Sequence, residues 1–322
     1  MKINLPVDDY VARRPYISAS EAHKTFSDEM HTFWNMKVGN IDPPDISHLE
    51  PIKRGKRIEK NMPEWIFEDY GMEIEANFDT YLSKKFPWAI ATPDGFLKGD
   101  DGKYGVEFKA PSIFNSSYGE PDTDDIPQHN LVQVHHSMAV LPRLKGYYLF
   151  TYTENGITRY VIKKDKEIET KLMEKESRFK GFVDENVPPP PRNEQDLIYH
   201  YFKTTKKTYL ENPSSEVLDA CNKLKQARNK KKNDKSNEDE LNFIIKRGIG
   251  EHSGIKFPDG NILRMDRCFA KAKVDEAKLF AVDKDEYKKH CTKFDPESYA
   301  KANPNSEYVV RNPYTKLHFP KD

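Results

Sequence analysis

The chain has 322 residues, of which 36% are hydrophobic, and its 52 Lys and Arg residues balance 52 Asp and Glu residues. A chain of this length and composition can bury a full core and has room for two domains, which excludes disorder throughout. Because the formal charges cancel, no overall basicity indicates a nucleic-acid partner, and any polyanion must be bound locally.

Two short helices are predicted near the N-terminus. The first begins with the capping-box spacing of Ser18 and Glu21, and the second begins at Ser27 and can be stopped by Gly39. Residues 40–54 contain several prolines and are expected to form a loop.

An amphipathic helix is predicted over residues 55–71, with its start weakened by Pro63. The hydrophobic period then changes from helical to extended. Strands are expected at residues 78–82, 88–92, 104–109, 146–152 and 158–162, and helices at residues 127–140 and 165–180. This alternation of helices and strands predicts an α/β fold.

A run of prolines at residues 188–191 is expected to act as a semi-rigid spacer. We therefore expect a core domain over residues 1–187, a linker over 188–192 and an extension over 193–322. Residues 1–187 hold 25 basic and 31 acidic side chains, whereas residues 188–322 hold 27 and 21, so the second part suits a polyanion better. The extension is predicted to be a helical hairpin of residues 194–210 and 214–247, followed by a small β unit with a turn at residues 257–261.

Two carboxylates and a lysine are expected to converge on a β-hairpin. If residues 99–102 form the turn, paired positions add to 201, which places Asp94 opposite Glu107. Alternation brings Lys109 to the same face and sends Phe108 into the core.

Carboxylates this close repel each other unless a cation lies between them, and Mg²⁺ is the first choice, with Mn²⁺ as an alternative. Such an ion would support phosphodiester hydrolysis, with Lys109 positioning the water or stabilising charge on the phosphate. The same residues also fit a surface ladder of alternating charges, so the pattern alone leaves both interpretations open.

Six motifs follow one another within residues 14–187. In chain order they are Ser18 to Ser20 at a helix start; Trp34, Lys37 and Gly39; Gly55 with Glu59; Thr-Pro-Asp-Gly at 92–95; Glu-Phe-Lys-Ala-Pro at 107–111; and Gln-Val-His at 133–135. Their order and spacing resemble those of the YqaJ-like viral recombinase family, the lambda-type exonucleases among the PD-(D/E)xK nucleases. Asn130, where the family often has an aromatic residue, is a departure from the pattern, as is the separation of Glu59 from Pro63.

The resemblance implies a restriction-endonuclease-like core, in which a central mixed sheet is flanked by helices. It also implies a metal-dependent 5′-to-3′ exonuclease that acts on double-stranded DNA ends and leaves 3′ single strands for phage-type recombination. A single-strand annealing protein as partner and a homotrimeric ring around the duplex are further implications. By the same resemblance, Asp94, Glu107 and the Phe108 carbonyl would hold the metal, Lys109 would be the catalytic lysine, Glu59 would serve a second metal or its water, and Gln133 would lie at the edge of the site.

Two basic segments are candidates for DNA contacts. Arg13 and Arg14 precede the first helix and could hold a terminal 5′-phosphate. The run from 223 to 235 would attract phosphates non-specifically through Lys230, Lys231 and Lys232. Each segment also fits a solvated surface, as an N-terminal arm or as the outer face of a long helix.

Two other function classes stay open beside the exonuclease. A structure-selective endonuclease on the same core would cut covalently closed DNA, and a non-catalytic DNA-end-binding scaffold would not respond to Mg²⁺. The three scattered cysteines, Cys221, Cys268 and Cys291, exclude an iron–sulfur nuclease and favour a reducing compartment. No apolar run reaches the roughly 18 residues of a membrane helix, and the N-terminus lacks a signal-peptide core, so we expect a cytoplasmic protein of a bacterial or phage-infected cell.

Overall fold

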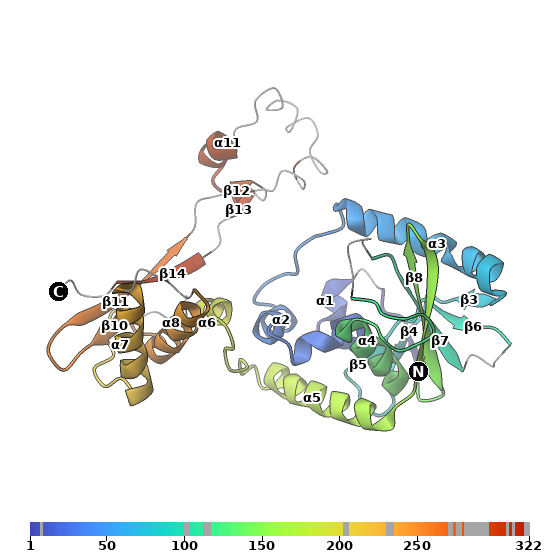
Figure 1. The fold of residues 1–322 in the computed structure, drawn as a ribbon, viewed down its shortest axis with the longest axis horizontal. Helices are drawn as coiled ribbons and strands as arrows, with labels where there is room; N and C mark the ends of the chain where they lie inside the picture. The colour runs from blue at the N-terminus through green and yellow to red at the C-terminus, as the bar shows by residue number, and fades with distance from the viewer. Residues whose placement is uncertain are drawn as a thin grey trace. The chain divides into compact units, whose positions relative to one another are not determined.

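The computed structural model describes residues 1–6, 9–99, 103–111, 117–201, 206–229, 235–269, 273–274, 279, 296–306, 309–310 and 313–318. The chain divides into two compact units, Met1–Pro189 and Pro190–Asp322 (Figure 1). Across the described ranges, every helix is too short or too polar to cross a membrane.

The first unit combines helices with two sheets. Its helices are α1 (Tyr10–Arg13), the 3-10 helix η1 (Ala19–Thr25), α2 (Met30–Lys37), α3 (Glu50–Tyr70), α4 (Gln128–Val140) and α5 (Lys166–Asp184). Its strands are β1 (Lys2–Ile3), β2 (Ile17–Ser18), β3 (Ile74–Ala76), β4 (Thr80–Leu82), β5 (Ala89–Ala91), β6 (Gly95–Leu97), β7 (Tyr104–Lys109), β8 (Gly146–Thr153) and β9 (Gly156–Lys163).

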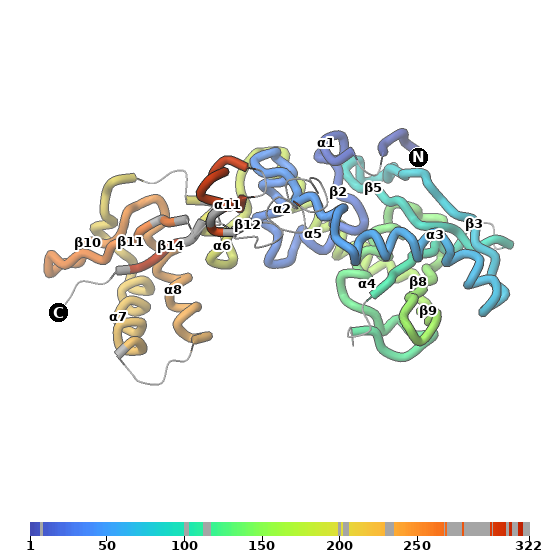
Figure 2. Tube along the Cα trace, turned by 90° about the horizontal axis from the view of Figure 1, so that it is seen from above, coloured from blue at the N-terminus to red at the C-terminus, as the bar shows by residue number. Residues whose placement is uncertain are grey.

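The larger sheet of this unit has the order β3-β6-β7-β8-β9. Its β7 and β8 strands are parallel and are connected through α4, whereas the other neighbours are antiparallel. On one face, Met62 and Ile66 of α3 pack against Phe108, and Figure 2 shows α3 alongside these strands. On the other face, Val134 of α4 packs in a cluster with Leu149. A mixed sheet with helices on both faces confirms the predicted fold class.

The smaller sheet, β1-β4-β5-β2, lies in the same unit beside η1. The capping box that opens η1 is present as predicted, because the Ser18 hydroxyl and backbone N–H both donate to the Glu21 carboxylate, at 2.6 and 3.1 Å. Next along the chain, α2 packs on α5 through a stacked pair of rings, Phe33 and Phe179, whose centroids are 5.0 Å apart.

The α3 helix starts earlier than the sequence predicted. It begins at Glu50, so the expected loop over residues 40–54 is wrong at its end and Gly55 lies inside the helix. Pro51 occupies the first turn, where a missing N–H costs nothing because that donor has no partner within the helix. Gly71 ends the helix as expected, with a left-handed φ of 63°.

The second unit contains helices and a small sheet, but the predicted hairpin of residues 194–210 and 214–247 is wrong, because the helices are divided differently. Its described elements are α6 (Glu194–Tyr201), α7 (Ser215–Asn229), α8 (Lys235–Ile249), β10 (Gly254–Lys256), β11 (Ile262–Phe269), β12 (Lys273–Val274), α11 (Pro296–Ala302), β13 (Val309–Val310) and β14 (Pro313–His318). The predicted single helix over 214–247 is two helices, because Leu224 of α7 packs against Ile245 of α8 in one core.

The predicted hairpin turn in the second unit is confirmed. Phe257 N–H donates to Asn261 O at 2.8 Å, and Gly260 takes a φ of 86° that favours glycine. The turn joins β10 to β11, and β14 pairs with the other side of β11 to give a three-stranded sheet.

Candidate active site

The β6 and β7 strands bring Asp94 next to Glu107. Gly95 pairs with Val106 in the antiparallel ladder, and these positions add to 201 as predicted. Asp94 N–H also donates to Val106 O, at 3.1 Å, so Asp94 lies just beyond the last paired residue of β6. The turn residues 100–102 lie outside the described part of the chain.

The glycine after Asp94 is required by the neighbouring strand. A Cβ at Gly95 would lie 2.9 Å from Glu75 O and 2.7 Å from Ile74 Cγ2, both on β3. These contacts are shorter than a Cβ can accept, so the Thr-Pro-Asp-Gly motif lets β6 pair closely with β3 and holds Asp94 at the end of the ladder.

Glu107, Lys109 and Gln133 form a connected network on the α4 face of the sheet. Lys109 Nζ donates to Glu107 Oε1 at 2.7 Å and to Gln133 Oε1 at 3.1 Å. Gln133 Nε2 donates to the same Glu107 oxygen at 2.6 Å. Both Glu107 and Gln133 are buried, which strengthens these contacts. The alternative of a solvated surface ladder of charges does not fit this arrangement, because Glu107 and Gln133 are buried and hydrogen bonds connect all three side chains.

The ionisation of Asp94 is disfavoured by its surroundings. Burial raises the pKa of Asp94 well above its usual value, and the negative charge of Glu107 raises it further. The Phe108 N–H, which donates to Asp94 Oδ2 at 2.7 Å, opposes this shift. A cation between the two carboxylates would favour their charged forms and so would oppose the raised pKa of Asp94.

Lys109 keeps its positive charge inside this site. Burial lowers the pKa of Lys109, but the carboxylates of Glu107 and Asp94 more than offset that effect, so the pKa is raised above its ordinary value. The ammonium group is thus a fixed positive charge next to the carboxylate pair.

Glu59 of α3 faces the same site from the other side. Its side chain is accessible to solvent, yet the surrounding protein still removes part of its hydration. This desolvation raises the pKa of Glu59; the charge of Lys109 opposes the shift and that of Glu107 adds to it. The sequence departs from the family pattern here, because Glu59 and Pro63 are separated. Pro63 lies one turn after Glu59 inside α3, so it has no N–H to donate to the Glu59 carbonyl.

A pocket of about 670 Å³ contains the residues expected to carry chemistry. Its lining includes Asp94, Glu107, Phe108, Lys109, Glu59, Gln133 and Arg13. The fold therefore brings the predicted site residues together in one pocket. Of the two N-terminal arginines, Arg13 is in the lining and Arg14 is not.

Arg14 is held elsewhere. Its guanidinium Nη2 lies 2.6 Å from Asp42 Oδ1, and its Cζ lies over the Tyr10 ring at 5.6 Å from the centroid. The expected DNA contacts Lys230, Lys231 and Lys232 lie outside the described residues.

The donors present suit a magnesium ion that is completed by water or phosphate. Within the described ranges, no three His, Cys, Asp or Glu side chains are grouped closely enough to hold a metal by themselves. Mg²⁺ is commonly held by one or two carboxylates together with waters and substrate phosphates, and Asp94 with Glu107 provides such a pair.

The Phe108 carbonyl is a third suitable oxygen. Phe108 N–H donates to Asp94 Oδ2 at 2.7 Å, so the backbone of this residue lies beside the Asp94 carboxylate. The Phe108 carbonyl points to the same edge of β7 as the Val106 carbonyl, which receives Asp94 N–H.

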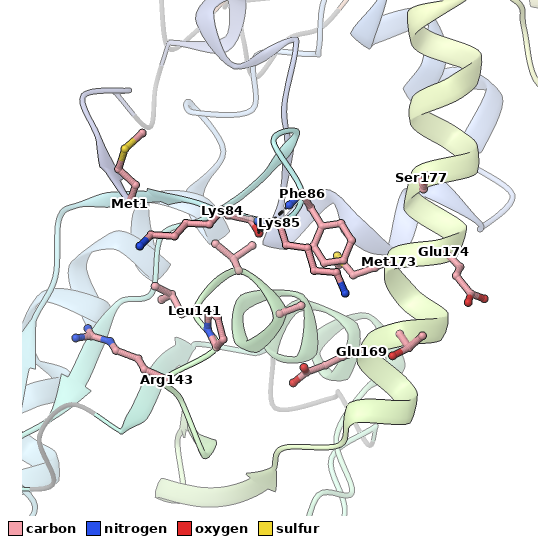
Figure 3. Close-up of a pocket in the computed structure, with 15 residues that line it drawn as sticks. Met1, Lys84, Lys85, Phe86, Leu141, Arg143, Glu169, Met173, Glu174 and Ser177 are labelled. Atoms are coloured by element: carbon pink, nitrogen blue, oxygen red, sulfur yellow. Dashed lines mark hydrogen bonds between the residues drawn. The ribbon is translucent and has the colours of Figure 1, made fainter.

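Another cavity in the first unit, of about 690 Å³, has different chemistry. Figure 3 shows Lys84 and Arg143 on one side of this cavity and Glu169 and Glu174 of α5 on the other. Apolar side chains, including Phe86, Leu141 and Met173, make up much of the rest. It contains no facing pair of carboxylates with a lysine, so the smaller pocket is the candidate active site.

The sequence-based prediction did not single out several pocket residues. These are Lys56 and Lys60 on α3, and Ala76, Asn77 and Phe78 near the end of β3. For the two lysines a signal was available, because Lys56 lies three residues before Glu59 and four residues before Lys60 on the same predicted helix. For Asn77 and Phe78 no local pattern indicated the pocket, since their approach depends on the pairing of β3 with β6.

The fold and the pocket define an α/β domain whose central hairpin carries a carboxylate pair and a lysine. Residues 10–151, which contain every residue of the pocket lining, match the YqaJ-like viral recombinase domain. The match confirms the resemblance that the sequence motifs predicted.

Solved structures with similar folds include an alkaline exonuclease from Laribacter hongkongensis, at 15% identity and a TM-score of 0.45, with 55% of this chain and 92% of that chain covered. The same enzyme in complex with dAMP matches to the same extent. A phage-related exonuclease from Haemophilus somnus 129PT matches at 12% identity and a TM-score of 0.43, with 53% and 95% covered. No curated protein matches the chain.

Proposed function

We propose that this protein is a metal-dependent exodeoxyribonuclease that degrades double-stranded DNA from an end in the 5′-to-3′ direction and leaves a 3′ single strand. The observation that carries the proposal is the convergence of Asp94, Glu107 and Lys109 in one pocket. The match of residues 10–151 to the viral recombinase domain supports a phage-type nuclease acting on DNA.

Asp94, Glu107 and the Phe108 carbonyl would hold Mg²⁺, with Mn²⁺ as a substitute, and Glu59 would orient water from the opposite wall. Bound there, the ion supplies Lewis-acid activation of the phosphodiester and of the attacking water. Lys109 directs its ammonium charge at the phosphate, where negative charge grows during the reaction. Gln133 holds Lys109 and Glu107 in register through its two hydrogen bonds.

Basic residues at the pocket would bind the DNA backbone. Arg13 shares the pocket with the carboxylates and would bind a terminal 5′-phosphate, while Lys56 and Lys60 would contact neighbouring phosphates. In the second unit, Lys230, Lys231 and Lys232 would also bind the DNA backbone.

The experiment that tests this function compares linear 5′-phosphorylated duplex with covalently closed duplex, each with Mg²⁺ and with EDTA. We expect Mg²⁺-dependent loss of the linear DNA, release of mononucleotides, a surviving 3′-ended strand and intact circles. The variants Asp94→Asn and Glu107→Gln should abolish cutting, and Lys109→Ala should slow it at least about a hundredfold. Cutting of closed circles would instead identify an endonuclease, and cutting that ignores Mg²⁺ and all three variants would refute the site.

The assembly around DNA is also a proposal. A homotrimeric ring would keep the duplex in a channel, and a single-strand annealing protein would receive the 3′ strand. Light scattering at micromolar concentration, with and without DNA, checks the ring, and a monomer in both conditions would refute it.

A further inference from the structure

Phe78 is an aromatic side chain that protrudes into solvent beside the candidate active site. It lies in the bend between β3 and β4 and is 90% exposed, yet it lines the pocket that holds Asp94 and Lys109. Single exposed apolar side chains are common on protein surfaces, so the exposure alone indicates nothing. The hydrogen bonds that fix the neighbouring backbone indicate a role for this side chain.

The neighbouring residue Asn77 ties this bend to the segment that carries the metal ligand. Asn77 N–H donates to Asp94 O at 2.9 Å, and its side-chain Nδ2 donates to Pro93 O at 2.8 Å and to Asp79 O at 3.0 Å. Its Oδ1 accepts from the Tyr81 hydroxyl at 3.2 Å. The base of the Phe78 side chain is therefore fixed relative to Asp94, and the exposed ring stands on a rigid support.

Phe78 also separates two hollows. On one side is the candidate active site, and on the other is a hollow of about 340 Å³ that is lined by residues 2–6 and by Asp79 and Thr80. A strand whose phosphate lies in the pocket beside Lys109 would bring its neighbouring base past Phe78. Basic side chains for phosphates and an aromatic face for a base are the two components of surfaces that bind single nucleic-acid strands.

We propose that Phe78 is a stacking platform for a nucleobase next to the cleaved phosphate. The inference rests on the proposed nuclease function and adds a residue that binds the base instead of the phosphate. Every base has a π-face, so the platform tolerates any sequence, as an exonuclease without sequence preference requires. Loss of such a stack weakens binding by roughly 5- to 150-fold.

The test measures binding in EDTA, where no hydrolysis is needed. Full-length protein is titrated with a duplex that has a frayed end and carries 2-aminopurine, in turn, at the terminal positions of each strand. We expect Phe78→Ala and Phe78→Leu to weaken binding within the range above and to reduce the quenching of the probe, and Phe78→Tyr to restore both. Because the ring contributes little to the core, all three variants should keep the parental Tm.

Phe67 provides a matched control. It is an aromatic residue of α3, 57% exposed and outside the pocket lining, so Phe67→Ala should leave binding unchanged. A duplex with an abasic site at the quenched position should bind wild-type protein and Phe78→Ala equally well. Parental affinity of Phe78→Leu, or equal losses for Phe67→Ala and Phe78→Ala, would overturn the platform.

The two proposals fail separately. If wild-type protein binds the frayed end through Phe78 but does not cut it with Mg²⁺, the nuclease function is wrong and the base platform stands. If it cuts, and Phe78→Ala neither raises KM nor weakens binding in EDTA, the platform is wrong and the nuclease stands.

Discussion

His136 and Glu176 pair inside the first unit, with Nδ1 and Oε1 2.8 Å apart and neither side chain exposed to solvent. The other ring nitrogen, Nε2, lies 3.1 Å from Ile90 O, which can only accept, so Nε2 must carry a proton. The contacts join α4 to α5 and to β5. Because Gln133 lies one turn before His136 on α4, the pair also holds the helix that presents Gln133.

Removing one member of this pair should destabilise the first unit. We expect His136→Leu to lower the free energy of unfolding by about 3–5 kcal/mol, because Glu176 is then left buried without its partner. Urea unfolding followed by tryptophan fluorescence measures this, since Trp34, Trp65 and Trp88 all belong to the first unit.

The double variant His136→Leu with Glu176→Met provides the control for that prediction. It replaces both polar groups by apolar ones, so its loss of stability should be smaller than the sum of the two single losses. Additive losses would show that the two side chains are not coupled.

Replacing Asp94 by Asn should stabilise the metal-free protein. The raised pKa of Asp94 means that the folded state holds this proton more tightly than the unfolded chain does. Ionisation of Asp94 therefore lowers the stability of the folded state as the pH rises from the ordinary pKa of 3.8 to the raised pKa. Above the raised pKa this loss of stability stays constant. Asn cannot ionise and still offers an oxygen to Phe108 N–H. The stability of Asp94→Asn relative to the wild type should therefore increase as the pH rises between these two pKa values.

Thermal unfolding in EDTA between about pH 5 and about pH 8 checks the Asp94 prediction. Addition of Mg²⁺ should raise the Tm of the wild type and reduce the advantage of Asp94→Asn, whose own Tm should not respond. A difference in Tm that does not change with pH, or equal responses to Mg²⁺, would contradict it.

Gln133→Ala should reduce turnover more than substrate binding. The variant loses the donor to Glu107 and the acceptor for Lys109, so both groups can move away from the phosphate, and a fall in kcat of about a hundredfold is expected with little change in KM. Gln128→Ala, an exposed position at the start of the same helix, is the matched control and should behave as wild type. Equal activity of the two variants would remove Gln133 from the site.

The two N-terminal arginines should differ in function. Arg13 lines the pocket, so Arg13→Ala should reduce the preference for 5′-phosphorylated over hydroxyl ends. Arg14 pairs with Asp42, so Arg14→Ala should leave that preference unchanged. Competition between the two kinds of end gives the measurement, and an equal effect of both variants would argue against an end-binding role specific to Arg13.

Charge reversal of Lys230, Lys231 and Lys232 to Glu should weaken binding to long DNA and flatten its salt dependence. Each lost phosphate contact should reduce the log–log slope by about 0.9. A variant with Lys163, Lys166 and Lys171 changed to Glu has the same net charge and alters exposed residues away from the pocket, so its slope should stay near the wild-type value. Identical slopes in all three proteins would leave the second unit without a DNA role.

The candidate site could be predicted from sequence where short-range geometry determines it. A hairpin fixes its own register, so Asp94 and Glu107 followed from a turn near Gly99 and the alternation of β7. Gln133 was reached only through the resemblance, because its position depends on how α4 packs on the sheet.

Other features depend on long-range packing and carry no local signal. Glu176 lies 40 residues from His136, and nothing in the charged pattern of α5 distinguishes this buried acid from its solvated neighbours. The division of residues 214–247 into two helices was missed because the whole stretch has high helix propensity, and only the shared core of α7 and α8 separates them. The early start of α3 was missed because Pro51 can begin a helix as well as interrupt one.

The parallel pairing of β7 with β8 determines when the site is completed during protein synthesis. Parallel neighbours require a long connection, and here that connection contains α4 and Gln133. The hairpin of β6 and β7 can form as soon as Lys109 is available, but Gln133 cannot be fixed against Glu107 until β8, at Gly146–Thr153, has been made and paired. A growing chain can therefore bring its carboxylates together before Gln133 reaches Lys109, and we expect the complete site only once the crossover has closed.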